Sequence, residues 1–337
     1  MVNLSTKYMG LELKNPIIIG ACNLTNDLDF APRLEDSGAA AIVCKSLFEE
    51  QIQLENLQIH EEMSEYANRN AEMITLFPEM EHAGPQEFLI NLAKLKKSVN
   101  IPVIASLNAV YKETWLEYSK LIEETKVDAL ELNFFTVPDK FDKDAETISN
   151  QEIEIFKEIK KQLKIPVSIK MSPYYANPLN IISRFDKEGV DGFVLFNKFL
   201  QPDIDIQKEE HHLPHMLSSQ EDNKLPLRYA GLLFENIHGS VCCNSGIHTA
   251  EDVIKMILGG ADCVQVVSTI YMNKPEYLQI MLAEIEKWME SKGYNKLSDF
   301  KGKLSKKALK DRFVYKRAQY IDILLQNAEI FKKNLTR

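Results

Sequence analysis

Several features are scarce in this chain of 337 residues. Basic side chains are outnumbered, because 40 Lys and Arg stand against 49 Asp and Glu, which gives a net charge of −9. A grip on the phosphate backbone of nucleic acid needs clustered basic residues, so we expect no nucleic-acid partner. No apolar run approaches the roughly 18 residues of a membrane span, and residues 1–5 lack the pattern of a signal peptide. We therefore expect a cytoplasmic protein without membrane contact.

Cysteine is also sparse, and its spacing argues against cysteine-rich metal sites. The five cysteines are Cys22, Cys44, Cys242, Cys243 and Cys263. None forms a Cys-x-x-Cys pair, so the sequence supports neither a zinc site nor an iron–sulfur cluster. The spacing of His211, His212 and His215 would permit a metal cluster. No cysteine lies near them, so we expect a solvated polar loop there and no metal.

The chain does contain the ordinary composition of a globular protein, with 45% apolar and 26% charged residues. Eight short apolar runs recur along it. Each run is typical of a strand buried on both faces, and such strands form parallel sheets. The runs are 16–21, 40–44, 102–107, 129–133, 166–171, 192–196, 240–243 and 263–267.

Amphipathic stretches lie between most of these runs, with apolar residues three and four positions apart, as in residues 153–163. Eight β/α units predict an α/β fold of the (β/α)8 TIM-barrel type. A doubly wound open sheet is the alternative. The count of eight favours the barrel, and so does the absence of a Gly-x-Gly-x-x-Gly sequence after the first run.

Several segments lie outside the predicted barrel, within a single domain over residues 1–337. Residues 4–13 alternate about Met9-Gly10 and predict an N-terminal β-hairpin that closes the barrel floor. Insertions follow the second strand, at 45–85, and the sixth strand, at 198–226. Both leave the carboxyl ends of strands, where barrel active sites are built, so either insertion is a candidate lid. Beyond residue 275 we expect a helical extension, over about 276–337, on the outside.

Small polar residues follow the last two predicted strands. Ser245-Gly246 follows the seventh strand, and Ser268-Thr269 follows the eighth. Such pairs let backbone N–H groups approach a phosphate at a helix N-terminus. A plain turn at Ser245-Gly246, with Thr249 as a helix N-cap, would account for the same residues without a ligand. We favour the phosphate site, which many barrel families share.

Lys170 ends the fifth predicted strand. An ammonium at a buried strand end is costly unless it has an anionic partner, so its position favours a functional role. Asn108, Asn133 and Asn197 end the third, fourth and sixth strands in the same way. Asparagine offers both a donor and an acceptor. A ring of asparagines with a lysine therefore suits a flat heterocycle with alternating N–H and C=O groups.

These residues resemble the dihydroorotate dehydrogenases in order and spacing over nearly the whole chain. The matching positions are Asn15-Pro16, Lys45-Ser46, 101–106, 131–133, 167–170, Asn197, 244–247 and Ser268-Thr269. Residues 46–52, 196–199, 201–203 and 225–228 resemble in particular the branch described as dihydroorotate dehydrogenase-like. The resemblance implies an FMN-binding barrel that oxidises dihydroorotate or a related cyclic amide, as in pyrimidine biosynthesis, with the flavin as hydride acceptor.

The resemblance also implies a role for each matching residue. The implied FMN contacts are Ala21, Cys22, Lys45, Ser46, Asn108, Asn133, Lys170, Phe196, Ser245, Gly246, Ser268 and Thr269. Lys170 would stabilise the negative charge of the reduced flavin, and the last four residues would hold the phosphate. Lys45, Asn133 and Asn197 would face the substrate.

One departure from the family pattern concerns the catalytic base. Cytosolic members carry Asn-Leu-Ser-Cys-Pro-Asn after the fourth strand, with the Cys as base. Residues 133–139 read Asn-Phe-Phe-Thr-Val-Pro-Asp here, so Thr136 falls at the Cys position. A threonine hydroxyl needs an activating partner to remove a proton. Thr136 is the candidate catalytic base, and Lys170 is the second candidate catalytic residue.

Two other functions stay open. The family's substrate loop, Asn-Ser-Met-Gly-Leu-Pro-Asn, has no match in residues 68–73, so the chain is alternatively an FMN protein that has lost orotate activity. A flavin-free barrel that acts on a phosphorylated metabolite as a lyase or isomerase is the other alternative. A small-molecule substrate is expected, and a homodimer is compatible with the sequence.

Overall fold

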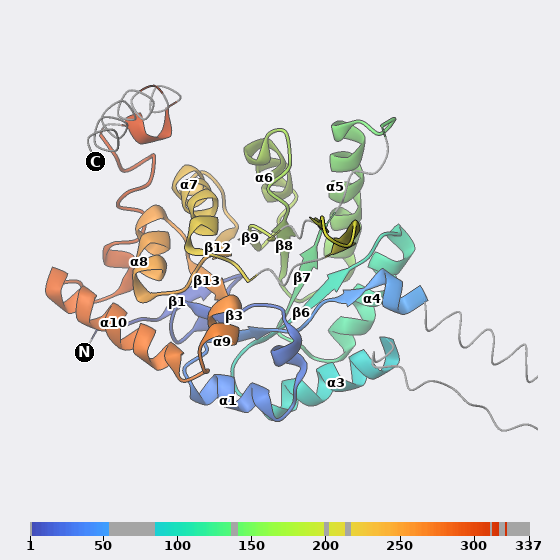
Figure 1. The fold of residues 1–337 in the computed structure, drawn as a ribbon, viewed down its shortest axis with the longest axis horizontal. Helices are drawn as coiled ribbons and strands as arrows, with labels where there is room; N and C mark the ends of the chain where they lie inside the picture. The colour runs from blue at the N-terminus through green and yellow to red at the C-terminus, as the bar shows by residue number, and fades with distance from the viewer. Residues whose placement is uncertain are drawn as a thin grey trace, which may run out of the picture.

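The computed structural model describes residues 2–53, 85–135, 141–198, 202–212, 217–310, 312–316 and 321. Eight parallel strands form a barrel (Figure 1). The barrel closes where β4 (Ala41–Val43) pairs with β6 (Val103–Asn108). The barrel strands are β3 (Ile17–Ile19), β4 (Ala41–Val43), β6 (Val103–Asn108), β7 (Ala129–Asn133), β8 (Val167–Met171), β9 (Gly192–Leu195), β12 (Ser240–Asn244) and β13 (Cys263–Val266). The predicted TIM barrel is confirmed, and closure excludes the open sheet.

Helices surround the barrel because each presents an apolar face to the strands; α5, for example, buries Ile153, Phe156 and Ile159. The helices between strands are α1 (Phe30–Asp36), α3 (Pro85–Ser98), α4 (Lys112–Glu124), α5 (Ala145–Gln162), α6 (Pro178–Lys187), α7 (Lys224–Leu233) and α8 (Ala250–Gly259). The short helix α9 (Ser268–Met272) follows the last strand, and η1 (Asn23–Asn26) follows the first.

The N-terminal hairpin fills the lower end of the barrel. Strands β1 (Thr6–Tyr8) and β2 (Leu11–Leu13) pair antiparallel about the Met9-Gly10 turn, where both residues have positive φ. Tyr8, Met9 and Leu13 are buried against inward-facing side chains of the barrel strands. A Cβ atom on Gly192 would lie 2.8 Å from Met9 Cγ, so a glycine at this position of β9 makes room for the N-terminal hairpin. The hairpin predicted at the floor is confirmed.

Three aspartates at strand starts fasten neighbouring strands together at the floor. Asp128 Oδ2 accepts the backbone N–H of Val103 at 2.7 Å, and so connects the start of β7 with that of β6. In the same way, Asp191 Oδ2 accepts the backbone N–H of Val167 at 2.7 Å. Asp262 Oδ2 accepts the backbone N–H of Val241 at 2.8 Å. Each carboxylate also pairs with a lysine; the lysines are Lys96, Lys160 and Lys301. We call these three arrangements the aspartate clasps.

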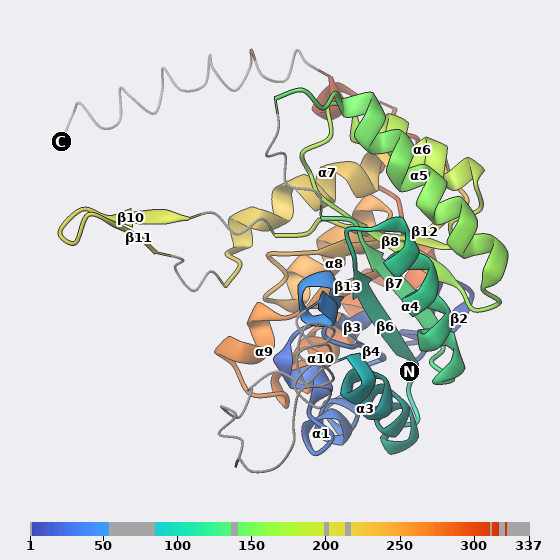
Figure 2. The same cartoon turned by 90° about the vertical axis from the view of Figure 1, so that its right-hand side faces the viewer.

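The two predicted insertions leave the carboxyl ends of the second and sixth barrel strands. The first begins with β5 (Leu47–Phe48), which adds to β6; residues 54–84 lie outside the described part of the chain. The second contains the hairpin of β10 (Asp203–Asp205) and β11 (Glu210–His212), which projects away from the barrel (Figure 2). The turn η2 (Gln220–Asn223) then leads into α7.

The three histidines of the second insertion have a spacing that would permit a metal cluster. His211 and His212 are exposed on β11, whereas His215 lies outside the described residues. Within the described ranges, no group of three or more His, Cys, Asp or Glu side chains is arranged to hold a metal ion.

Within the described residues, the segment after the barrel begins with a long helix. Helix α10 (Tyr277–Lys292) packs against α8 and ends at Gly293, whose φ of +73° lies in the left-handed region. Turns and the short helices η3 (Leu297–Asp299) and η4 (Phe313–Tyr315) follow. The left-handed residue ends the run of helical backbone of α10. Over the described ranges, no helix has both the length and the apolar character needed to cross a membrane.

The burial of the N-terminal hairpin at the barrel floor leads to a prediction about stability. Tyr8→Ala should lower the free energy of unfolding by about 3–5 kcal/mol, because it removes a large ring from a closed space. Tyr111→Ala is the matched control, since Tyr111 is 58% exposed whereas Tyr8 is 0% exposed. Urea unfolding followed by circular dichroism measures both. Equal losses in the two variants would contradict the assignment of the hairpin to the core.

Candidate active site at the carboxyl ends of the barrel strands

The inside of the barrel changes from apolar to polar along β6 and β7. Because side chains alternate between the two faces of a strand, every second residue points inward. On β7 the inward series is Ala129, Glu131 and Asn133, and on β6 it runs from Ile104 through Ser106 to Asn108. The strands therefore carry buried polar groups at their carboxyl ends, which is where catalytic residues of such barrels lie.

The predicted asparagines meet at this end. Asn108 Nδ2 donates to the backbone oxygen of Asn133 at 3.0 Å, and Asn197 Nδ2 donates to Asn133 Oδ1 at 2.7 Å. The Ser46 hydroxyl lies 2.7 Å from that of Ser106 on the neighbouring strand. Polar side chains from neighbouring β/α units thus line the mouth from the second to the sixth barrel strand.

Lys170 lies beside this row and is 7% exposed. Its Nζ is 4.0 Å from Glu131 Oε1, and Glu131 Oε2 accepts a hydrogen bond from Gln265 Nε2 at 2.7 Å. Burial raises the pKa of the Glu131 carboxyl, while the Lys170 ammonium and the Gln265 amide act in the opposite direction. The anionic partner that a buried lysine needs is therefore present, although the sequence alone did not identify Glu131 as that partner.

A cavity of about 170 Å3 opens next to Lys170 at the ends of β8, β9, β12 and β13. Its lining residues include Lys170, Asn197, Lys198, Ser218, Ser245, Gly246 and Ser268. Ser245 and Gly246 have φ of +74° and +72°, a conformation that turns the backbone sharply after β12. A Cβ atom at Gly246 would lie 2.5 Å from the backbone nitrogen of Asn223, so only glycine fits beside η2.

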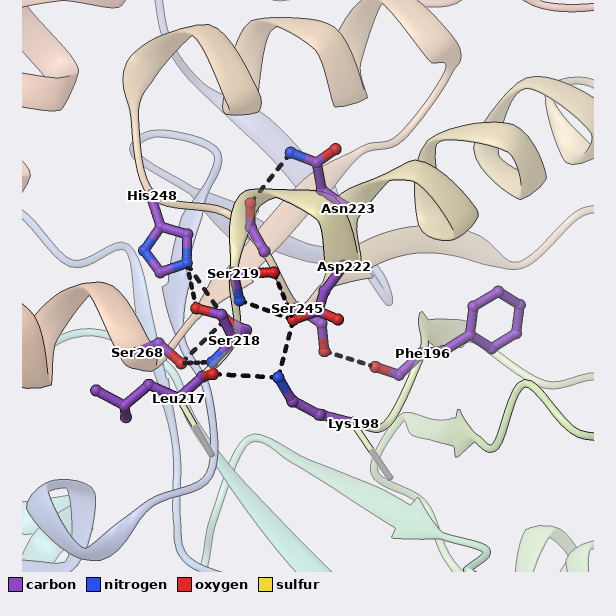
Figure 3. Close-up of polar contacts among 11 residues, drawn as sticks. Phe196, Lys198, Leu217, Ser218, Ser219, Asp222, Asn223, Ser245, His248 and Ser268 are labelled. Atoms are coloured by element: carbon purple, nitrogen blue, oxygen red, sulfur yellow. Dashed lines mark hydrogen bonds and ion pairs between the residues drawn. The ribbon is translucent and has the colours of Figure 1, made fainter. Parts of the chain in front are cut away.

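The loop before η2 brings further polar groups to the cavity (Figure 3). The backbone N–H of Ser218 donates to Ser268 Oγ at 2.8 Å, and the Ser218 hydroxyl donates to the same atom at 2.9 Å. His248 Nε2 lies 2.8 Å from the Ser218 carbonyl oxygen. Lys198 donates to the Leu217 carbonyl oxygen at 3.1 Å and forms an ion pair with Asp222 at 2.9 Å.

Sequence reasoning missed Ser218, His248 and the site role of Lys198. They come from three separate loops, and only the closed barrel brings them beside Ser268. His248 follows closely after the Ser245-Gly246 turn, so its place in the sequence was the one signal that could have pointed to it.

Other predicted contact residues occupy less direct positions. The Thr269 hydroxyl donates to the Ile247 carbonyl oxygen at 2.6 Å, so its side chain is committed to the turn after β12. The Ser245 hydroxyl donates to the Phe196 carbonyl oxygen at 3.1 Å, and the Phe196 ring points away from Ser245 (Figure 3). This ring packs on Tyr229. The backbone N–H of Lys45 donates to Asn26 Oδ1 at 2.9 Å.

Two remaining predictions concern the first strand and the base. Ala21 packs against the apolar cluster that the hairpin forms with the inward-facing barrel residues, and Cys22 is partly buried at the start of η1. Burial raises the pKa of the Cys22 thiol, so the neutral form is favoured there. Thr136, the candidate base, lies outside the described residues.

These residues fit a phosphorylated planar cofactor. The turn at Ser245-Gly246 and the N-terminal end of α9 supply a narrow, donor-rich pocket of the kind that accepts an anion. The asparagine row and Lys170 supply donors and a positive charge at the adjoining barrel mouth. Fold and site together define a barrel of the phosphate-binding class, with a polar, amide-lined mouth.

Comparison with known proteins names the family within this class. The family model for dihydroorotate dehydrogenase matches residues 3–289. A protein of Thermoplasma volcanium named dihydroorotate dehydrogenase B (NAD(+)), catalytic subunit, is 27% identical over 308 residues, which are 90% of this chain and 98% of that protein. Proteins of the same name from Methanocaldococcus jannaschii and Caldicellulosiruptor saccharolyticus are 25% and 23% identical, and cover 84% and 90% of this chain and 92% and 100% of their own lengths.

The chain belongs to the dihydroorotate dehydrogenase family. The family consists of FMN-dependent oxidoreductases that act on CH–CH groups, so the predicted cofactor and the predicted class of enzyme are confirmed. Membership also sets aside the flavin-free lyase or isomerase.

The tight fit at Gly246 generates a binding prediction. Gly246→Ala should weaken FMN binding at least tenfold, or by about 1.4 kcal/mol, because the added methyl group collides with η2 and distorts the turn. Gly189→Ala is the matched control, since Gly189 also has a positive φ but no atom within 4 Å of the added carbon. FMN fluorescence on titration of the apoprotein measures both affinities. Similar losses in the two variants would show that backbone strain alone is responsible.

Proposed function

We propose that this barrel oxidises dihydroorotate, or a closely related cyclic amide, in pyrimidine biosynthesis in the cytoplasm. The single observation that supports the substrate class best is the row of Asn108, Asn133 and Asn197 beside Lys170. Its alternating donors and acceptors complement the N–H and C=O groups of a cyclic amide. The nearby ammonium suits a ring or carboxylate that carries negative charge.

We assign the cofactor contacts to the residues that line the barrel mouth. Ser245, Gly246 and Ser268, with the backbone of Thr269, would hold the phosphate at the cavity. The ring would contact Ala21, Cys22, Lys45, Ser46, Asn108, Asn133, Lys170 and the backbone of Phe196. FMN, when bound, supplies a hydride acceptor.

The protein's own residues would then orient the substrate and manage its proton. Asn133 and Asn197, held by their mutual hydrogen bond, would fix the plane of the substrate amide, with Lys45 on the opposite side. Thr136 would remove the proton next to the carbon that loses hydride, and would pass its own hydroxyl proton to a water molecule or to the Asp139 carboxylate. Lys170 would stabilise the negative charge that develops at the ring, an effect that is larger in the transition state than in the ground state.

A second subunit is the partner that the relatives suggest. Their names describe them as catalytic subunits and carry NAD(+), so we infer that this chain too passes electrons to another protein. We also propose that the barrel forms a homodimer, which is compatible with binding to a second type of subunit.

The substrate and the base are tested together. Under anaerobic conditions, dihydroorotate should bleach the flavin absorbance of the wild-type protein, and Thr136→Ala should bleach more slowly because the proton acceptor is gone. Dithionite should reduce both proteins at the same rate, since it needs no base. Stopped-flow absorbance measures these rates. If the wild type never bleaches, the substrate is wrong; if the variant bleaches as fast as the wild type, the base is wrong.

Lys170→Ala should slow reduction by substrate more than it weakens FMN binding. Loss of one charge-assisted contact in the transition state raises the barrier by about 2–4 kcal/mol. Lys96→Ala is the matched control, because Lys96 is also a partly buried lysine paired with a carboxylate, but at the barrel floor. Rates of reduction and FMN dissociation constants are measured for both variants. An unchanged reduction rate in Lys170→Ala would refute the role of this ammonium.

A further inference from the structure

Glu131 is a buried carboxyl group for which the reaction described above has no use. It lies in the middle of β7 and is 0% exposed. Removing a carboxylate from water costs several kcal/mol unless it is paired and hydrogen-bonded. A glutamate at this depth therefore indicates a specific partner, and the contacts of each of its oxygens identify that partner.

The two oxygens of Glu131 have different surroundings. Oε2 accepts the hydrogen bond from Gln265 Nε2 at 2.7 Å, which fixes the plane of the carboxyl group. Oε1 accepts no hydrogen bond from any described residue and lies 4.0 Å from Lys170 Nζ. Gln265 lies on β13 and is 1% exposed, and its own Oε1 accepts no hydrogen bond from any described residue. The amide thus holds Glu131 with its second oxygen toward the ammonium.

Lys170 is the one cation that the described residues place against Glu131. The hairpin contributes Tyr8 and β12 contributes Cys242, and both interact electrostatically with the carboxyl group. Burial raises the pKa of the Tyr8 hydroxyl and of the Cys242 thiol well above their usual values, so both stay neutral near pH 7. Ser168, next to Glu131 on β8, carries no charge.

We propose that Glu131, held by Gln265, is a positioning residue that fixes Lys170 at the barrel mouth and offsets part of its positive charge. The proposal rests on the proposed role of Lys170 toward the flavin. Lys170 Nζ lies near Glu131, and the Lys170 side chain also lines the cavity. The carboxylate thereby sets how strongly the ammonium favours an electron-rich ring, so it tunes the reduction potential of bound FMN.

The sign of the effect follows from the charges. Without the carboxylate, the ammonium is not offset, and the reduced form of bound FMN is stabilised relative to the oxidised form. Because burial raises the pKa of Glu131, its negative charge is present at high pH and is lost as pH falls through that pKa. Wild type and Glu131→Gln should therefore differ at high pH and converge as the pH is lowered.

The test measures the two-electron midpoint potential of bound FMN, by equilibration with a reference dye between about pH 6 and 9. Glu131→Gln should raise the equilibrium constant for FMN reduction about tenfold at the upper end, equal to about 30 mV for a two-electron couple. Glu131→Asp retains the charge and should stay nearer the wild type, and it provides a second variant if the glutamine variant fails to fold. FMN absorbance and thermal unfolding show that each variant is loaded and folded.

Two comparisons separate positioning from a general structural role. Glu152→Gln is the matched control, because Glu152 is a buried carboxyl group on α5 that is bonded to Tyr175, outside the barrel interior, and should leave the potential unchanged. In a Lys170→Met background, adding Glu131→Gln should shift the potential much less than it does alone. The inference is overturned if the shift persists fully without Lys170, or if Glu131→Gln leaves the potential unchanged at every pH.

The same measurement separates this inference from the proposed function. The potential needs FMN but no substrate, so failure of dihydroorotate to bleach the flavin does not affect it. If Lys170→Met alone leaves the potential unchanged, the proposed role of Lys170 fails, and the inference fails with it. If Lys170→Met changes the potential but Glu131→Gln does not, only the inference fails.

Discussion

A closed barrel of parallel strands buries the side chains that point inward, so the polar groups among them depend on one another for hydrogen bonds and charge pairing. The two-residue period of the strands sorts these side chains into layers. Ala129, Glu131 and Asn133 on β7 show the sequence of layers: an apolar floor, a charged middle and an amide-lined mouth. The N-terminal hairpin completes the apolar floor with Tyr8.

The barrel itself could be predicted closely from the sequence. Continuous apolar runs mark strands that are buried on both faces, and all eight runs coincide with barrel strands to within a few residues. The end of α10 at Gly293 was not predicted, because charged, amphipathic sequence continues past Lys292. The β10–β11 hairpin was not predicted, since exposed strands of three residues carry no clear apolar period.

The site was predicted in part. Lys170 and the three asparagines stand at the ends of recognisable strands, where a polar residue that closes an apolar run points to the barrel mouth. Glu131 stands inside such a run, and a run alone does not say which residues face the barrel interior and which face the helices. Ser218 depends on a loop whose path follows from tertiary packing, and its approach to Ser268 bridges 50 positions in the chain.

The aspartate clasps divide the barrel into pairs of units. They join β6 to β7, β8 to β9 and β12 to β13, and within the described ranges no aspartate clasp joins β7 to β8 or β9 to β12. Each clasp links residues only 21 to 25 positions apart, so the loop that it closes is short and can form early. In folding terms, these three strand pairs are local contacts that can form before the ring closes, whereas β3 and β4 carry no aspartate clasp within the described ranges.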